Sequence, residues 1–174
     1  MRATVQSFNG ACEVMARLTV LDLMVDKILA TVDPAFYASI QRLHKWRMDN
    51  FASSRAFDSL SPVSVLHEGR EIQYNRFSAR HVDLRDPHFT WVVIFYLGDF
   101  GEATLEFRQL GIRIILRPGA AVAFRGRELV HEGLEWARGN RYLVIYFTHS
   151  ALWEQATMSC GASEAVPDRD AETN

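Results

Sequence analysis

Four polar residues within residues 80–147 constrain this chain more than any other feature, because short apolar segments of β-strand character separate them. His81 and Asp83 are one residue apart, His131 follows 48 residues after Asp83, and Arg141 follows ten residues after His131. Side chains two positions apart on a strand point to the same face, so His81 and Asp83 can reach one metal ion together. The long interval before His131 leaves room for several strands and turns.

Two imidazoles and one carboxylate form the facial triad of non-haem Fe(II) oxygenases, which leaves coordination positions open for a cosubstrate and O₂. Zinc hydrolases also use two histidines and a carboxylate. His81, Asp83 and His131 therefore predict a metal site, but the triad does not by itself name the metal.

Arg141 helps to distinguish an iron oxygenase from a zinc hydrolase. It opens the apolar segment 142–147, and strand alternation places Arg141, Leu143, Ile145 and Phe147 on one face. A guanidinium in an otherwise apolar β-interior requires an anionic partner, since burying it unpaired is costly. Its planar fork suits a carboxylate. A dicarboxylic keto acid fits this arrangement, with one end on the metal and the other on Arg141.

The order H-x-D, distant His and nearby Arg resembles the 2-oxoglutarate/Fe(II)-dependent dioxygenases. The intervening segments are similar to those of the fungal TET/JBP-like branch, whose members are related to thymine and 5-methylcytosine hydroxylases. The segments that carry this resemblance, within residues 74–148, are Leu97-Gly98-Asp99-Phe100-Gly101, Leu105-Glu106-Phe107, Leu110-Gly111-Ile112, Leu116-Arg117-Pro118-Gly119 and Phe124-Arg125-Gly126.

The resemblance implies a dioxygenase that holds Fe(II) with His81, Asp83 and His131, uses 2-oxoglutarate and O₂ as cosubstrates, and clamps the distal carboxylate with Arg141. The metal would carry the oxidation, while the protein holds the open positions and a dry pocket.

Further candidates surround these four residues. A polar residue on the strand before the triad contacts 2-oxoglutarate in related dioxygenases, which makes Tyr74 and Asn75 candidates here. Arg125 is a candidate for contacting 2-oxoglutarate or substrate. Asp86 is a candidate acceptor for a triad histidine or for substrate. His88 and His149 are interpreted as bystanders, with a place near the mouth of the site as an alternative for His88.

The rest of the pattern predicts a mainly β fold with N-terminal helices. Helical periodicity covers residues 18–32 and 34–48, and the second helix begins with Asp33 as N-cap and Pro34 at its first position. Residues 51–62 are expected to form a loop. Strands are expected at residues 71–77, 90–97, 104–107, 112–116, 121–124 and 141–148. Short strands with frequent glycine turns, together with the motif, indicate a double-stranded β-helix (jelly roll) braced by two helices.

We expect one domain, with a helical support region at 1–62, an oxygenase core at 63–155 and a disordered acidic tail at 156–174. Cys12 and Cys160 are interpreted as free thiols in a reducing compartment. The sequence has no signal-peptide pattern and no apolar run of membrane-spanning length. We therefore expect no membrane association and an intracellular location, in the nucleus or cytoplasm.

The sequence is compatible with several classes of substrate. The resemblance suggests a methylated pyrimidine base in DNA or RNA, although a net charge of −2 is not that of a strongly basic nucleic-acid binder. The arginines that could face phosphates are Arg108, Arg113, Arg117, Arg125 and Arg127. A small metabolite or a protein side chain is an alternative substrate. A non-catalytic jelly-roll binding module and a zinc or nickel cupin-like enzyme are alternative classes. Oligomeric state is not predicted.

Overall fold

The computed structural model describes residues 10, 13–14, 16–59, 63 and 65–160. Its chain divides into two compact units, Met1–Leu66 and His67–Asn174, which we call the helical unit and the β unit and describe separately. The three predicted ranges 1–62, 63–155 and 156–174 remain a prediction. Within the described residues, no helix is long and apolar enough to cross a membrane.

The helical unit contains α2 (Thr19–Val32), α3 (Pro34–Asn50) and α4 (Ala52–Asp58). The two predicted helices are present, and Asp33 caps α3 as expected by accepting a hydrogen bond from the Phe36 N–H at 3.0 Å. The predicted loop is wrong over α4. That segment contains no glycine or proline, and Arg55 ties it to the end of α3 by donating to the Met48 carbonyl at 2.5 Å.

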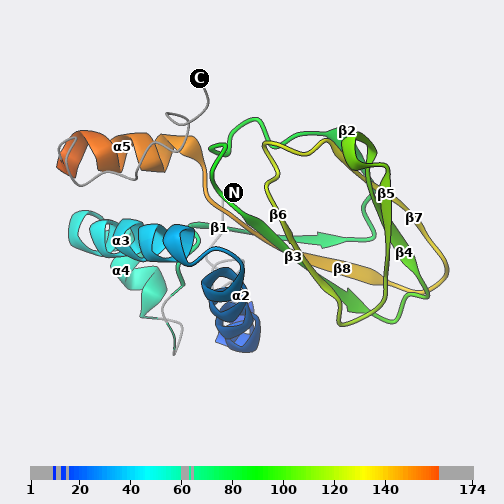
Figure 1. Cartoon of the computed structure of the whole chain (residues 1–174). Helices are drawn as coiled ribbons and strands as arrows, with labels where there is room; N and C mark the ends of the chain where they lie inside the picture. The colour runs from blue at the N-terminus through cyan, green and yellow to red at the C-terminus, as the bar shows by residue number, and fades with distance from the viewer. Residues whose placement is uncertain (1–9, 11–12, 15, 60–62, 64, 161–174) are drawn as a thin grey trace, which may run out of the picture. The chain divides into compact units, whose positions relative to one another are not determined.

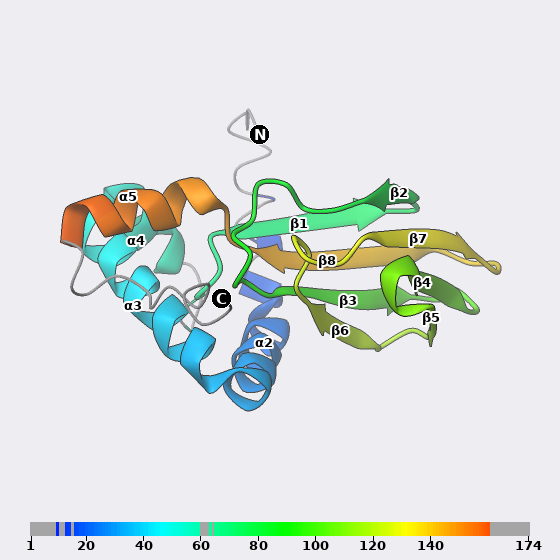
Figure 2. The same cartoon turned by 45° about the horizontal axis from the view of Figure 1, so that its top comes forward.

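The β unit consists of two four-stranded antiparallel sheets (Figure 1). The first sheet has the order β1-β8-β3-β6, and the second has the order β2-β7-β4-β5. Figure 2 shows the strands of both sheets from a second direction. The first sheet comprises β1 (Gly69–Tyr74), β8 (Arg141–Phe147), β3 (Val92–Gly98) and β6 (Ala121–Phe124). The second comprises β2 (Ser78–His81), β7 (His131–Trp136), β4 (Ala103–Phe107) and β5 (Ile112–Leu116), with the short 3₁₀ helix η1 (Arg108–Leu110) between β4 and β5.

The inner faces of the two sheets share one hydrophobic core. The central strand β3 is buried from Val92 to Tyr96, as its β-branched and aromatic sequence predicts. In β4 every second residue is buried, so its inner face packs on the core and its outer face does not. The buried cluster comprises Val92, Ile94, Tyr96, Phe100, Ala103, Leu105, Phe107, Leu116, Phe124 and Leu143. This arrangement confirms the predicted double-stranded β-helix with N-terminal helices.

Three elements of the β unit were not predicted. Strands β2 and β7 carry His81 and His131, and their polar composition hides their strand character. Helix α5 (Ser150–Cys160) follows β8, so the predicted tail boundary at residue 156 falls inside a helix. Trp153 anchors α5 through an edge-to-face contact with Phe89, with ring centroids 5.2 Å apart. Residues 161–174 lie outside the described residues.

Candidate metal centre

His81 and His131 are cross-strand neighbours in the second sheet. His81 is the last residue of β2 and His131 is the first residue of β7, and the two pair directly in the antiparallel register. Opposed residues of an antiparallel pair place their side chains within reach of one another. The two ring centroids are accordingly 4.2 Å apart. Strand pairing therefore closes the long sequence interval between the two histidines.

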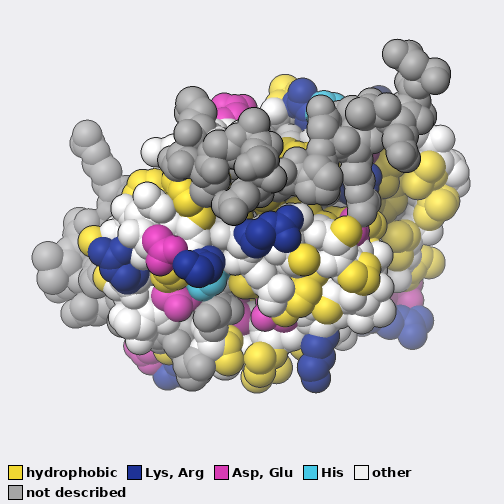
Figure 3. All heavy atoms as spheres, turned by 60° about the vertical axis from the view of Figure 1, so that its left-hand side comes forward, with side chains coloured by type: hydrophobic (Ala, Val, Ile, Leu, Met, Phe, Trp, Pro, Cys, Tyr) yellow, Lys and Arg dark blue, Asp and Glu magenta, His cyan; other side chains and the backbone are white. Residues whose placement is uncertain are grey.

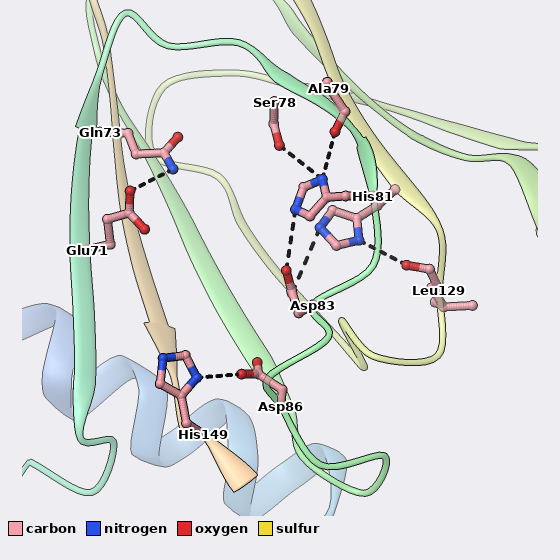
Figure 4. Close-up of polar contacts among 10 residues, drawn as sticks. Glu71, Gln73, Ser78, Ala79, His81, Asp83, Asp86, Leu129 and His149 are labelled. Carbon is pink, nitrogen blue, oxygen red and sulfur yellow. Dashed lines mark hydrogen bonds and ion pairs between the residues drawn. The ribbon is translucent and has the colours of Figure 1, made fainter. Parts of the chain in front are cut away.

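Both histidines are oriented in the same way by their own backbone. Nδ1 of His81 donates to the Ala79 carbonyl at 2.7 Å, and Nδ1 of His131 donates to the Leu129 carbonyl at 2.9 Å. Each hydrogen bond therefore reaches back two residues and fixes the proton on Nδ1. Figure 4 shows the His81 ring turned toward Asp83, and Nε2 of His131 also faces the Asp83 carboxylate, so both Nε2 lone pairs are available to a metal ion.

Asp83 lies just beyond the end of β2 and is held by the turn that precedes β7. Its N–H donates to the Gly126 carbonyl at 3.0 Å. A Cβ atom on Gly126 would lie 2.0 Å from Asp83 Oδ2, so only glycine permits this close approach. Asp83 Oδ1 lies 3.3 Å from His81 Nε2, and Oδ2 lies 3.9 Å from His131 Nε2.

These distances fit a metal site. Two ligand atoms that bind one ion at right angles, each about 2.1 Å from it, lie about 3 Å apart. One ligand atom from each of His81, Asp83 and His131 falls within 4.8 Å of the others. The predicted metal triad is therefore brought together, and its donor set of two imidazoles and one carboxylate suits Fe(II).

The surroundings of His131 favour its neutral form, which is the form that binds metals. Burial lowers the pKa of His131, the hydrogen bond to Leu129 and the Asp83 carboxylate oppose this, and His81 adds to the lowering. Aromatic residues enclose the ring, and Phe124 contacts it edge to face with centroids 4.8 Å apart. A neutral, immobilised imidazole needs no deprotonation before it binds metal.

The triad opens onto a cavity of about 380 Å³ within the β unit. This volume lies in the range of small-molecule sites, roughly 300–1,000 Å³. Apolar side chains of both sheets form most of its wall, among them Val92, Ile94, Leu105, Leu143 and Ile145. The predicted inward face of β8 is confirmed, since Arg141, Leu143, Ile145 and Phe147 all line the cavity.

Arg141 is the most deeply buried charge of this cavity. Only 1% of its surface is exposed, and burial lowers the pKa of its guanidinium. One terminal nitrogen donates to the Arg76 carbonyl, while Nε is buried and has no hydrogen-bond partner among the described residues. No carboxylate of the described residues pairs with Arg141. A buried guanidinium without a carboxylate partner is costly, and its planar fork is suited to an anion.

Tyr96 on β3 lines the same cavity and was not predicted from the sequence. Its side chain is buried, and burial raises its pKa to about 12 although Arg141 acts in the opposite direction. The phenol therefore stays protonated and can donate a hydrogen bond to an anion near Arg141. A tyrosine inside an apolar strand gives no sequence signal that separates a cavity position from a core position.

A second polar pair lies at another part of the cavity wall. Nδ1 of His149 lies 3.1 Å from Asp86 Oδ1, and Figure 4 shows this pair apart from the triad. Burial raises the pKa of Asp86 to about 6, His149 opposes this, and Asp83 and Glu68 reinforce it. The hydrogen-bond partner of Asp86 is thus His149 and not a triad imidazole. His149 is not the bystander expected from the sequence, because it lines the cavity.

Three predicted cofactor-binding residues do not line the cavity. Tyr74 is exposed and stacks on Tyr142, with ring centroids 4.9 Å apart. Asn75 bonds to the backbone of Arg141. The Arg125 guanidinium lies 5.4 Å from the centroid of the Trp91 ring. The structure therefore gathers the triad and Arg141 around one cavity and leaves Tyr74, Asn75 and Arg125 outside it.

Comparison with solved structures supports the fold. The chain matches NgTET1, a TET/JBP 2-oxoglutarate/Fe(II) dioxygenase solved in complex with 5mC DNA, with a TM-score of 0.60 over 79% of its length. Sequence identity is 20%, and the chain spans about half of NgTET1, 51% of its length. The predicted structural resemblance to TET/JBP-like oxygenases is thus confirmed, and at this identity it establishes the fold.

Two further solved structures match the chain more weakly. Protein NMB1881 from Neisseria meningitidis matches with 14% identity and a TM-score of 0.34, over 47% of this chain and 76% of its own. A protein of the disulfide-linked pili that form Bacillus endospore appendages matches with 17% identity and a TM-score of 0.25, over 47% and 88%. No protein-family model and no curated protein sequence matches the chain.

Proposed function

We propose that this chain is an Fe(II)- and 2-oxoglutarate-dependent dioxygenase. One observation carries the proposal: a metal triad and a buried guanidinium without a carboxylate partner line the same cavity. A keto acid with a distal carboxylate would satisfy both groups at once. Zinc hydrolysis would use the triad but would give Arg141 no role.

Each residue then has a defined task. His81, Asp83 and His131 would hold the ion, Arg141 would pair with the distal carboxylate, and Tyr96 would donate a hydrogen bond beside it. An Fe(II) ion here would supply O₂ activation, with one oxygen atom going to succinate as 2-oxoglutarate loses CO₂ and the other to the substrate. The apolar walls would exclude water from the reacting groups.

A methylated pyrimidine base of nucleic acid is the substrate that we propose. With the Nδ1 proton of His149 directed at Asp86, Nε2 of His149 and Oδ2 of Asp86 are both available as acceptors for an amino or ring N–H of a pyrimidine base. The ring of Phe147 lies beside His149, with centroids 4.9 Å apart, and gives a planar ligand an aromatic surface. NgTET1 was solved with 5mC DNA.

Surface charge suggests how such a substrate would be held. On the face seen in Figure 3, Lys and Arg side chains are interspersed with Asp and Glu and form no continuous basic patch. Base oxidation requires an extruded or single-stranded base. Arg113 and Arg117, two of the arginines that could face phosphates, are each paired with a carboxylate at 3.0 Å, that of Glu106 and that of Glu102. We therefore infer that affinity depends on the cavity more than on phosphate contacts, and that single-stranded oligonucleotides are the better first substrates.

The test is an anaerobic titration of the protein with Fe(II) and 2-oxoglutarate, followed by turnover with O₂. We expect the visible charge-transfer band of the keto acid chelate, and its loss in His131→Ala. His88→Ala is the matched control, because His88 is an exposed histidine paired with Glu128 outside the cavity. A folded, iron-loaded protein without the band would refute the cosubstrate assignment and favour a binding module.

The substrate is tested by mass spectrometry of single-stranded oligonucleotides that contain 5-methylcytosine, thymine or cytosine, and of the free nucleosides. We expect succinate release coupled to the gain of one oxygen atom by a methylated base, and loss of that coupling in His149→Ala. Succinate release with no oxidised base in any of these would contradict the nucleic-acid substrate and point to a metabolite or protein side chain.

A further inference from the structure

The backbone N–H and C=O of Arg141 are both hydrogen-bonded to one residue, Asn75, which follows β1. The Asn75 N–H donates to the Arg141 carbonyl at 2.9 Å, and the Arg141 N–H donates to Asn75 Oδ1 at 2.8 Å. Asn75 thus continues the pairing of β1 with β8 by one position and replaces one backbone acceptor with its side chain. Its φ of 48° lies in the left-handed region, which asparagine tolerates better than most residues.

The Asn75 side chain is also held by Asn140. Its Nδ2 donates to Asn140 Oδ1 at 3.0 Å, and the Tyr74 hydroxyl donates to the same oxygen at 2.8 Å. The Asn140 N–H in turn donates to Asp99 Oδ1 at 2.7 Å. These contacts fix the amide so that Oδ1, and not Nδ2, faces the Arg141 N–H.

The guanidinium of Arg141 is fixed by a second residue, Trp136 at the end of β7. The guanidinium carbon lies 4.1 Å from the Trp136 ring centroid, so a side chain of the second sheet stacks on an arginine of the first. The indole N–H donates to the Gly139 carbonyl at 3.1 Å, and Phe77 packs on the ring at 5.2 Å between centroids. Stacking fixes the plane of the guanidinium, and therefore the direction of its hydrogen-bond fork.

Neither Asn75 nor Trp136 lines the cavity, whereas Arg141 does. We propose that Asn75 and Trp136 are positioning residues that act through Arg141, and that together they select a keto acid carrying a distal carboxylate over one without it. The proposal rests on the proposed function. It changes the role predicted for Asn75 from contact with the cosubstrate to orientation of the residue that makes the contact.

The experiment compares two keto acids that chelate a metal in the same way. 2-Oxoglutarate has the distal carboxylate and pyruvate lacks it. Calorimetric titration of the Mn(II)-loaded protein measures the affinity for each without turnover. We expect Asn75→Gly and Trp136→Leu each to weaken 2-oxoglutarate binding about ten-fold. This is the scale of one hydrogen bond between the guanidinium and the distal carboxylate, or of one desolvated cation–π contact. Affinity for pyruvate should not change.

Conservative variants separate positioning from a general structural role. Asn75→Gly accepts the positive φ but removes the acceptor, whereas Asn75→Asp keeps the acceptor and should retain most of the 2-oxoglutarate affinity. Trp136→Phe keeps an aromatic face and should retain more affinity than Trp136→Leu. In an Arg141→Met background, all four changes should have no further effect, because the residue through which they act is absent.

The outcomes distinguish two failures. If the wild-type protein binds 2-oxoglutarate no better than pyruvate, the proposed function fails at Arg141. If the wild-type protein prefers 2-oxoglutarate and the variants keep that preference, only the positioning proposal is overturned. Equal weakening of both ligands would also overturn it, because that result indicates general disruption of the site.

Discussion

Replacing Arg141 with methionine should stabilise the protein while removing its cosubstrate affinity. Arg141 is 1% exposed, its Nε atom has no hydrogen-bond partner among the described residues, and no carboxylate there neutralises it. Methionine has a similar length and no charge, and can pack on Trp136 through its sulfur. In the ligand-free protein the buried guanidinium has no anion to pair with, and its desolvation lowers the free energy of unfolding.

The magnitude follows from the contacts of Arg141. The variant loses a charged hydrogen bond to the Arg76 carbonyl, about 1.5–3 kcal/mol, and a stacking contact with Trp136, about 1–2 kcal/mol. It also removes the desolvation penalty of a buried charge, which is on the order of several kcal/mol. We expect a net gain of about 1 kcal/mol, which raises Tm by about 2–4 °C in a chain of this size.

Thermal unfolding with and without ligand measures both effects. At about 100 times its Kd, 2-oxoglutarate should stabilise the Mn(II)-loaded wild-type protein by about 2.7 kcal/mol, and it should not stabilise Arg141→Met. The control is Arg113→Met, because Arg113 is exposed on β5 and pairs with Glu106 at 3.0 Å. A lower Tm for ligand-free Arg141→Met, or an unchanged response to 2-oxoglutarate, would refute the reasoning.

Two further predictions test the metal site and the helical unit. Gly126→Ala should weaken Mn(II) binding about ten-fold or more, because the added Cβ displaces the Asp83 carboxylate by steric overlap, and metal titration measures this. Burial and then Asp22 raise the pKa of Asp26 to about 6, so the folded state binds more protons than the unfolded state between pH 4 and 6, and the free energy of unfolding falls as pH rises through that range. Asp26→Asn should therefore stabilise the protein by about 1 kcal/mol at pH 7.5, after a discount for partial exposure, and not at pH 4. Denaturant unfolding at both pH values decides this, and an equal effect at the two would contradict it.

Local patterns predicted much of the fold. The periodicity of residues 18–48, with Asp33-Pro34 between two helices, gave both helices nearly to their ends. The apolar strands β3 and β8 were equally clear, because β-branched and aromatic residues in a continuous run are typical of buried strands. Strands β2 and β7 were missed because Ser78–His81 and His131–Trp136 are rich in polar residues and lack the β-branched and aromatic run of β3 and β8.

The cavity was predicted only in part. Spacing identified the triad and Arg141, because two histidines and an aspartate form a metal-ligand set and a buried arginine requires an anionic partner. His149 and Tyr96 were missed, since each reaches the cavity through the packing of strands distant in sequence. Asn75 was selected for its position before the triad, but its side chain contacts the backbone of Arg141 and the side chain of Asn140 and does not line the cavity.

By itself, the sequence determined which side chains can bind a metal and which face of β8 is inward, because both depend on residue type and on alternation along one strand. Only the tertiary structure decided that His81 lies opposite His131, that Asp83 fits against Gly126, and that Trp136 stacks on Arg141. The Trp136–Arg141 contact joins the two sheets, and the other two contacts join segments that are distant in sequence. The pairing of Asn75 with Arg141 likewise spans 66 residues. Register between distant strands depends on the packing of the whole core, which no local pattern encodes.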